Sequence, residues 1–258
     1  MKIRVSTVVT TVDDDDGRLL YALQGWQRVF DEHNDCELIV VNDGGPNGVS
    51  SEAMKLVTHC GMHSKFLYLD PPSSEFRLAE ARNLGIQYAR GDRVTFTDSD
   101  CIPGIDLPAH HDLGDHKNKI TIGFRNRIAN PVYTNWGGFI PTNHDLCHAH
   151  WRKDERFDEQ HDPGWRGCEH VWGCNFGVDR DLLLECGGFD ESVIGWGGED
   201  INLADRLMRH KDTELVVTES VVFHLDHPPR TQRSKHPWGA RNRPLVVNGG
   251  SLGSAVNE

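Results

Sequence analysis

Residues 81–100 read ARNLGIQYARGDRVTFTDSD, and this stretch joins a helix to a strand that ends in two carboxylates. Apolar and small side chains recur on one helical face, which predicts a helix from about residue 75 to residue 89. That face comprises Leu78, Ala81, Leu84, Gly85 and Tyr88. Gly91 follows as the expected C-cap, and residues 92–100 then have the pattern of a buried strand. A helix followed closely by such a strand is typical of a sheet built from βαβ units.

The preceding part of the chain repeats this alternation of strands and helices. Strands are predicted at 3–12, 36–43 and 65–70, and helices at about 19–30 and near 51–59. The order β-α-β-α-β-α-β predicts an α/β fold with one Rossmann-like, doubly wound, mostly parallel sheet and helices on both faces. Such sheets bind ligands at the carboxyl ends of their strands.

The second half of the chain has weaker patterns. Periodicity fades between about residues 105 and 170, where we expect long loops with one or two short strands such as KITIGF at 119–124. Order returns with a strand and a short helix within 174–191, and with a strand within 214–227. After Pro228 the chain is polar and contains proline and glycine, so a mobile flap or a frayed tail is expected.

Composition narrows the class of protein. The 258 residues carry a formal net charge of -12 without a block of basic residues, which argues against nucleic acid as a bulk partner. The seven cysteines are scattered and lack the paired spacing of a zinc site, and reduced thiols in a cytoplasm fit this best. The apolar run at the N-terminus is too short for a signal peptide or a membrane span. We therefore expect a cytoplasmic protein without a membrane span.

Polar residues occupy the predicted carboxyl ends of two strands. Asp98 and Asp100 stand one residue apart, a spacing of hard oxygen ligands that suits Mg²⁺ or Mn²⁺, although an Asp-rich turn explains the same string. Asp43 precedes two glycines and is either a turn former or an acceptor for a nucleotide base or ribose. Arg77 and Arg82 flank this edge and are either phosphate contacts or exposed helix arginines.

The stretch GWGGED at 195–200 places two acids before a helix. Ile201, Ala204 and Leu207 share one face of that helix, so Glu199 and Asp200 lie at its N-terminus, where the dipole favours ionised carboxylates. Capping alone explains one acid but not the glycines or the tryptophan. Gly197 and Gly198 allow a ligand to approach the backbone, and Trp196 offers an apolar surface to a sugar.

Together these segments resemble GT-A glycosyltransferases. ARNLGIQYARGDRVTFTDSD and ELIVVNDGG, at 37–45, look like the two halves of their nucleotide-binding core. Residues 175–207 are similar to an acceptor-side motif of the β-1,4-galactosyltransferase, chondroitin-polymerase and polypeptide N-acetylgalactosaminyltransferase groups. The resemblance covers roughly residues 3–227. It implies a nucleotide-sugar-binding half at 1–104 and an acceptor-binding half of the same domain at 105–232. The polar composition beyond this region predicts a flexible C-terminal tail at 233–258.

The resemblance implies a donor site that holds a cation. The donor and nucleotide contacts that it assigns are Thr10, Asp43, Arg82, Asp98 and Ser99. Mn²⁺ or Mg²⁺ would be held by Asp98, Asp100 and His224, with Asp100 as the more direct ligand and His227 as a substitute for His224. A satisfied core histidine is the alternative for His224.

It also implies an acceptor site and a base. The acceptor contacts would be Trp196, Gly197, Gly198 and Glu199. Asp200 would be the general base of an inverting reaction, because a carboxylate that removes the hydroxyl proton assists attack on the anomeric carbon.

We therefore expect a metal-dependent glycosyltransferase that moves a sugar from a nucleotide diphosphate, a UDP-sugar by preference, to an acceptor hydroxyl with inversion. Two alternatives stay open. One is a retaining transferase with the same metal site, since the polypeptide-transferase group shares GWGGED yet retains configuration; the other is a non-catalytic glycan- or nucleotide-binding module. The string VDDDDG at 12–17 departs from the family pattern and is either a solvated acidic loop or a contribution to cation binding.

Overall fold

The computed structural model describes residues 2–12, 17–44, 50–59, 63–71, 73, 75–114, 118–129, 136, 140, 151–152, 167–210 and 212–227. The acidic loop at 13–16 and the predicted tail after residue 227 lie outside the described residues. The strands in chain order are β1 (Val5–Thr11), β2 (Cys36–Asn42), β3 (Lys65–Tyr68), β4 (Arg93–Asp98), β5 (Cys101–Pro103), β6 (Lys119–Ile128), β7 (Trp151–Arg152), β8 (Phe176–Asp179) and β9 (Glu214–Leu225). The helices are α1 (Arg18–Glu32), α2 (Ser51–His59), α3 (Leu78–Tyr88), α4 (Leu107–His111), η3 (Cys168–His170), α7 (Arg180–Glu185) and α8 (Glu199–Met208).

The strands of the described residues form one nine-stranded sheet in the order β3-β2-β1-β4-β8-β6-β9-β5, with β7 paired to β6. The strands β3, β2, β1 and β4 run parallel, as the alternation of strands and helices predicts. Beyond them β8 is antiparallel to both β4 and β6, while β6 and β9 are parallel to each other. The parallel half therefore continues into a mixed half within the same sheet.

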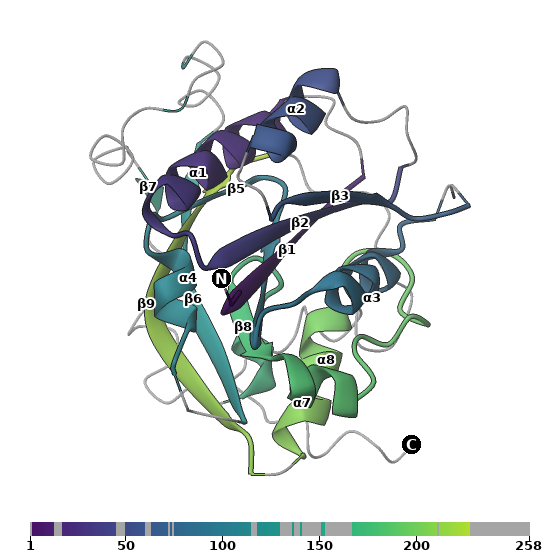
Figure 1. Cartoon of the computed structure of the whole chain (residues 1–258). Helices are drawn as coiled ribbons and strands as arrows, with labels where there is room; N and C mark the ends of the chain where they lie inside the picture. The colour runs from purple at the N-terminus through teal and green to yellow at the C-terminus, as the bar shows by residue number, and fades with distance from the viewer. Residues whose placement is uncertain are drawn as a thin grey trace.

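Both faces of the parallel half are buried, because alternate strand residues point to opposite sides. Val8 of β1 packs in one apolar cluster with Ala81 of α3 and Leu203 of α8. Val9 packs in a second cluster with Trp26 of α1. Figure 1 shows the corresponding layers, with α1 and α2 on one side of the sheet and α3, α7 and α8 on the other.

Helix α3 lies very close to the sheet, and a glycine makes this approach possible. A Cβ atom on Gly85 would come within 2.4 Å of Val8 Cγ1, so a larger residue would push the helix away from β1. The helix begins at Leu78 rather than near residue 75, because the Arg77 N–H and side chain bind Asp43. Gly91 is not the C-cap. Ala89 takes that position, and Gly91 instead lies against the Ser6 backbone.

The weakly patterned segment contains more regular structure than its sequence predicts. The short strand expected at 119–124 extends to Ile128 as β6 and pairs along much of its length with β9. The short elements β5 and α4 were not predicted, since three and five residues carry too little periodicity to be recognised. In the described part of the chain, no helix has the length and apolar character needed to cross a membrane.

Candidate active site

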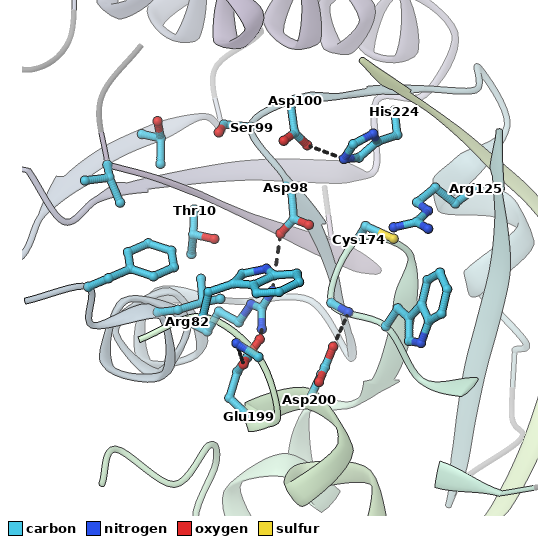
Figure 2. A pocket seen from close by; sticks show the side chains of 18 of the residues that line it. Thr10, Arg82, Asp98, Ser99, Asp100, Arg125, Cys174, Glu199, Asp200 and His224 are labelled. Atoms are coloured by element: carbon cyan, nitrogen blue, oxygen red, sulfur yellow. Dashed lines mark hydrogen bonds and ion pairs between the residues drawn. The ribbon is translucent and has the colours of Figure 1, made fainter. Parts of the chain in front are cut away.

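A cavity of about 490 Å³ opens at the carboxyl ends of β1 and β4 and faces the N-terminus of α8. Most of the predicted site residues line it, although they come from five separate parts of the chain. These lining residues are Thr10, Arg82, Asp98, Ser99, Asp100, Trp196, Gly197, Glu199, Asp200 and His224. Asp43 and Gly198 are not among the lining residues. Figure 2 shows Asp100 and His224 on one side of this pocket and Glu199 and Asp200 on the other.

Asp100 lies between two histidines from the end of β9. Its Oδ2 is 2.8 Å from His227 Nε2, and its Oδ1 is 3.6 Å from His224 Nε2. The antiparallel pairing of β5 with β9 places Cys101 opposite His224 and so brings this group together. Burial alone would raise the pKa of Asp100, but the two histidines outweigh it and hold this pKa well below its usual range.

The group is suited to a divalent cation. One donor atom from each of Asp100, His224 and His227 lies within 4.8 Å of the others, and Asp98, Asp100 and Cys101 form an overlapping group. His224 is buried, and its Nδ1 has no hydrogen-bond partner among the described residues, which does not fit a satisfied core histidine. Imidazole nitrogens with a carboxylate fit Mn²⁺ better than Mg²⁺, which prefers oxygen ligands.

Arg82 joins the two sides of the cavity. Its Nη1 donates to Glu199 Oε1 at 2.8 Å and its Nη2 to Asp98 Oδ1 at 3.2 Å, although Arg82 and Glu199 are 117 positions apart. Only 2% of Arg82 is exposed, so the expectation of an exposed helix arginine is wrong for this residue. Burial raises the pKa of Asp98, with Arg82 opposing and Asp100 adding to the effect.

Asp43 and Arg77 form a second buried ion pair outside the cavity lining. Arg77 Nη2 lies 2.7 Å from Asp43 Oδ1, and the Arg77 main-chain N–H donates to the other carboxylate oxygen. Arg77 is also buried, so the expectation of an exposed arginine is wrong here too. The pair fixes the segment between β3 and α3. The carboxylate of Asp43 is therefore already bonded to Arg77.

The glycines before α8 allow the chain to turn sharply into this helix. Gly195, Gly197 and Gly198 have φ values of 95°, 101° and 97°, a left-handed region that other residues rarely adopt. Gly198 occupies the N-cap position of α8, where no side-chain hydrogen bond caps the helix. The Glu199 carboxylate accepts a hydrogen bond from the Gly197 N–H at 3.1 Å. The glycines thus have a conformational role that sequence reasoning did not identify.

Asp200 is held by main-chain donors. Its Oδ2 accepts from the Gly173 N–H at 2.9 Å and its Oδ1 from the Ile201 N–H at 2.8 Å. Burial and the neighbouring charge of Glu199 raise the pKa of Asp200 to about 7, although Arg82 and the two N–H groups oppose the change. A carboxyl with such a pKa can accept and release a proton near neutral pH.

Sequence reasoning missed part of the cavity wall. The missed lining residues include 172–174, between η3 and β8, and two arginines of β6, whereas His227, which also lines the cavity, was predicted as a substitute ligand. The arginines are Arg125 and Arg127. The sequence FRNRI at 124–128 indicates that both arginines share a face, because alternate residues of a strand point to the same side. The arginines were missed because the strand was expected to end at residue 124.

Comparison with known families agrees with this architecture. A family model described as glycosyl transferase family 2 matches residues 17–187, which is more than half of the chain. The chain belongs to glycosyl transferase family 2. This family 2 member also matches a model described as the N-terminal domain of galactosyltransferase over residues 165–228, a span that contains α8 and β9. The resemblance to glycosyltransferases is thereby confirmed at the level of the family.

Two curated relatives show how far the similarity extends. Validoxylamine A glucosyltransferase of Streptomyces hygroscopicus subsp. jinggangensis (strain 5008) is 26% identical over 211 residues, covering 73% of this chain and 48% of the relative. Human chondroitin sulfate N-acetylgalactosaminyltransferase 2 is 35% identical over 102 residues, covering 38% of this chain and 16% of the relative. The family 2 chain thus spans at most about half the length of these relatives.

Two solved structures share the fold. GalNAc-T7 with UDP, GalNAc and Mn²⁺ superposes with a TM-score of 0.57 at 14% identity, covering 87% of this chain and 44% of that one. The mannosyltransferase PcManGT of Pyrobaculum calidifontis, in complex with GDP-Man and Mn²⁺, has a TM-score of 0.56 at 19% identity, with coverages of 93% and 60%. These likenesses confirm the predicted α/β fold of GT-A type.

Proposed function

We propose that this family 2 glycosyltransferase moves a sugar from a nucleoside diphosphate donor, by preference a UDP-sugar, to an acceptor hydroxyl with inversion. The observation that carries the proposal is the shared cavity. One wall has a carboxylate with two histidines that suit Mn²⁺, and the opposite wall has Asp200, whose pKa of about 7 suits a base. The complexes of GalNAc-T7 with UDP and Mn²⁺ and of PcManGT with GDP-Man and Mn²⁺ support this class of donor.

The donor side of the proposal uses the sheet edge. Asp100, His224 and His227 would hold the cation, with Asp98 beside them. When bound, Mn²⁺ neutralises charge on the leaving diphosphate as a Lewis acid. Thr10 and Ser99 line the same side of the cavity and would bind the nucleotide. Asp43 remains a proposed contact for the base, and a ligand there would have to share a carboxylate already bonded to Arg77.

The acceptor side of the proposal uses the N-terminus of α8. Trp196 is 41% exposed and lines the cavity, so its indole can contact the apolar face of a sugar acceptor, next to Gly197. Asp200 would take the hydroxyl proton during attack, an assistance typically of about 10²–10⁴-fold. Attack from the wall opposite the cation would invert the anomeric carbon. An acceptor hydroxyl at Glu199 would have to share a carboxylate that already accepts a hydrogen bond from Arg82.

One experiment tests the proposal as a whole. The wild-type chain is incubated with UDP- and GDP-sugars and a panel of saccharide acceptors, in Mn²⁺ and in EDTA, and the product is examined by anomeric NMR. We expect Mn²⁺-dependent transfer from a UDP-sugar to give a product of inverted configuration. Full activity in EDTA would reject the cation, and a retained configuration would reject Asp200 as the base of a single displacement.

A further inference from the structure

Asp200 is held by a short turn, and a main-chain hydrogen bond closes that turn. The Asn175 N–H donates to the Trp172 carbonyl at 3.2 Å, so residues 172–175 form a turn directly before β8. Gly173 lies inside the turn, and its N–H donates to Asp200 Oδ2 at 2.9 Å (Figure 2). Gly173 has no side chain that could fix its amide. The direction of this N–H therefore depends on what holds the turn.

The side chain of Asn175 anchors the end of the turn to the mixed half of the sheet. It is fully buried, and its Nδ2 donates to the Phe124 carbonyl at 2.9 Å and to the Ser220 carbonyl at 3.3 Å. Its Oδ1 accepts from the Ser220 hydroxyl at 3.0 Å and lies 2.8 Å from His111 Nε2. The Asn175 carbonyl accepts from the Gly123 N–H at 3.0 Å. This one residue therefore joins the turn to β6, β9 and α4.

The bonds of Asn175 determine which nitrogen of His111 carries the proton. Because Asn175 Nδ2 faces two carbonyls, which only accept, Oδ1 faces His111 and receives the proton of its Nε2. His111 Nδ1 then accepts from the Thr121 hydroxyl at 2.8 Å. Burial lowers the pKa of His111 to about 3, and the charge of Arg93 acts in the same direction. The ring is therefore neutral at ordinary pH and keeps this single arrangement.

A chain of hydrogen bonds leads to Asn175 from Arg93. Arg93 Nη2 donates to Thr121 Oγ1 at 2.9 Å and to the Gly177 carbonyl at 3.1 Å. The Gly177 carbonyl also lies 3.1 Å from Thr121 Oγ1, but the bond from Arg93 leaves the Thr121 proton to His111. Donors thus run in one direction, from Arg93 through Thr121 and His111 to Asn175. A guanidinium has only donors, so the direction of the chain is set at its start.

We propose that Asn175, oriented by His111, is a positioning residue for the transfer reaction and fixes the turn so that the Gly173 N–H meets the Asp200 carboxylate. This inference rests on the proposed function, in which Asp200 is the base. Neither Asn175 nor His111 lines the cavity, so both act through Gly173 rather than on a substrate. A hydrogen bond to a carboxylate favours its ionised form. The N–H thereby helps Asp200 to accept a proton at neutral pH.

The test measures the titration of Asp200 and the transfer rate in the same variants. Asn175→Ala removes the side-chain bonds, His111→Leu removes the donor to Oδ1, and His111→Gln can retain that donor. Carboxyl ¹³C NMR of the aspartate-labelled chain follows Asp200, whose signal is assigned by its absence from Asp200→Asn. Ser6→Ala is the matched control, since Ser6 is equally buried and its hydroxyl donates to Glu37 at 2.6 Å near the amino end of β1. Circular dichroism confirms the folding of each variant.

We expect the pKa of Asp200 to be about 7 in the wild type and higher in Asn175→Ala and His111→Leu, because the ionised carboxylate loses a donor. Glu199 of α8 and Arg82 of α3, the charged groups that also act on Asp200, are unchanged in these variants. The kcat at pH 7 should fall by about 10–100-fold, as for a small misplacement at a reacting group. It should recover in part as the pH rises, and His111→Gln should lie closer to the wild type.

Each other outcome decides against the inference or for it. A merely structural role would reduce the amount of folded protein and leave the pKa of Asp200 unchanged, and that result in the folded variants overturns the positioning role. The same pKa change in Ser6→Ala, or a changed pKa with wild-type kcat, also overturns it. If the wild type transfers no sugar, the proposed function fails, while the NMR titration still decides whether Asn175 positions Asp200. If Asn175→Ala does not fold, the two variants of His111 decide.

Discussion

Asp100 and Asp200 line the same cavity but have opposite electrostatic surroundings. Asp100 follows β4 and faces two histidines, and its pKa lies well below the usual range even though burial acts against this. Asp200 lies in the first turn of α8 next to another acid, and burial with the charge of Glu199 raises its pKa to about 7. The comparison teaches that the neighbours from β9 and α8, rather than the residue type, decide which aspartate suits a cation and which suits a proton.

The largest expected effect comes from removing the proposed proton acceptor, Asp200. Asp200→Asn should lower the transfer rate by about 10²–10⁴-fold, because the amide cannot take the hydroxyl proton. Nucleotide binding in Mn²⁺ should remain close to that of the wild type. The measurement is steady-state transfer beside calorimetric titration with UDP. Asp205→Asn on the same helix is the matched control, since Asp205 pairs with Arg209, and it should leave transfer unchanged.

Removing the carboxylate of Asp100, which faces His224 and His227, tests the proposed cation site. Asp100→Asn should weaken Mn²⁺ binding at least as much as the roughly 10–100-fold typical for loss of a residue that orients metal ligands. Calorimetric titration with MnCl₂ measures this directly. Asp112→Asn, which affects a salt bridge to Arg4, is the control. If Mn²⁺ binds both variants with equal affinity, the cation does not lie at Asp100.

Gly173→Ala tests the ion pairs by which Arg82 links Asp98 to Glu199. A Cβ atom at this position would lie 2.0 Å from Arg82 Nη2, so the guanidinium would have to leave its place between Asp98 and Glu199. We expect a loss of about 1–3 kcal/mol in the free energy of unfolding, as for overpacking, together with reduced transfer. Urea denaturation measures the first effect. A variant with wild-type stability and activity would mean that Arg82 need not occupy this position.

Glu199→Gln separates two roles for Glu199. If its charge raises the pKa of Asp200, the midpoint of the pH dependence of kcat/KM should move from near 7 to a lower pH. The less compensated charge of Arg82 would act in the same direction. If Glu199 instead binds the acceptor, as the resemblance implies, the acceptor KM should rise and the midpoint should stay near 7. A pH series of initial rates at varied acceptor concentration distinguishes these results.

A further effect concerns the pH dependence of stability rather than activity. The pKa of Asp200 is about 7 in the folded chain and about 3.9 when unfolded, so the folded state retains a proton between these values. Stability should therefore fall as the pH rises through this window, by up to about 1.4 kcal/mol per pH unit, and Asp200→Asn should lack that loss. Urea midpoints should thus favour Asp200→Asn more at pH 8 than at pH 5. A constant difference between the two pH values would contradict the raised pKa.

Much of the parallel half could be predicted, because its strands are buried runs of β-branched residues that end at polar positions. The same logic placed Asp98 and Asp100 at the edge of the sheet. Their place in one site with the acids of α8 was implied by the resemblance to GT-A glycosyltransferases, and all four residues line the cavity. The ion pair between Arg82 and Glu199 could not be predicted, since nothing in the local pattern of either residue indicates a partner 117 positions away. Arg125 and Arg127 were missed as cavity residues because β6 continues beyond the apolar run from which the strand was predicted.

The hydrogen bond that orients Asp200 comes from the peptide backbone, and side-chain replacement does not delete a peptide N–H unless proline is introduced. Trp172 and Cys174, on either side of that amide, both line the cavity. Libraries randomised at positions 172 and 174 could therefore widen or narrow the range of substrates while the Asp200 carboxylate, the proposed base, keeps its hydrogen bond to the Gly173 N–H. Gly173 itself should be left constant in any such redesign.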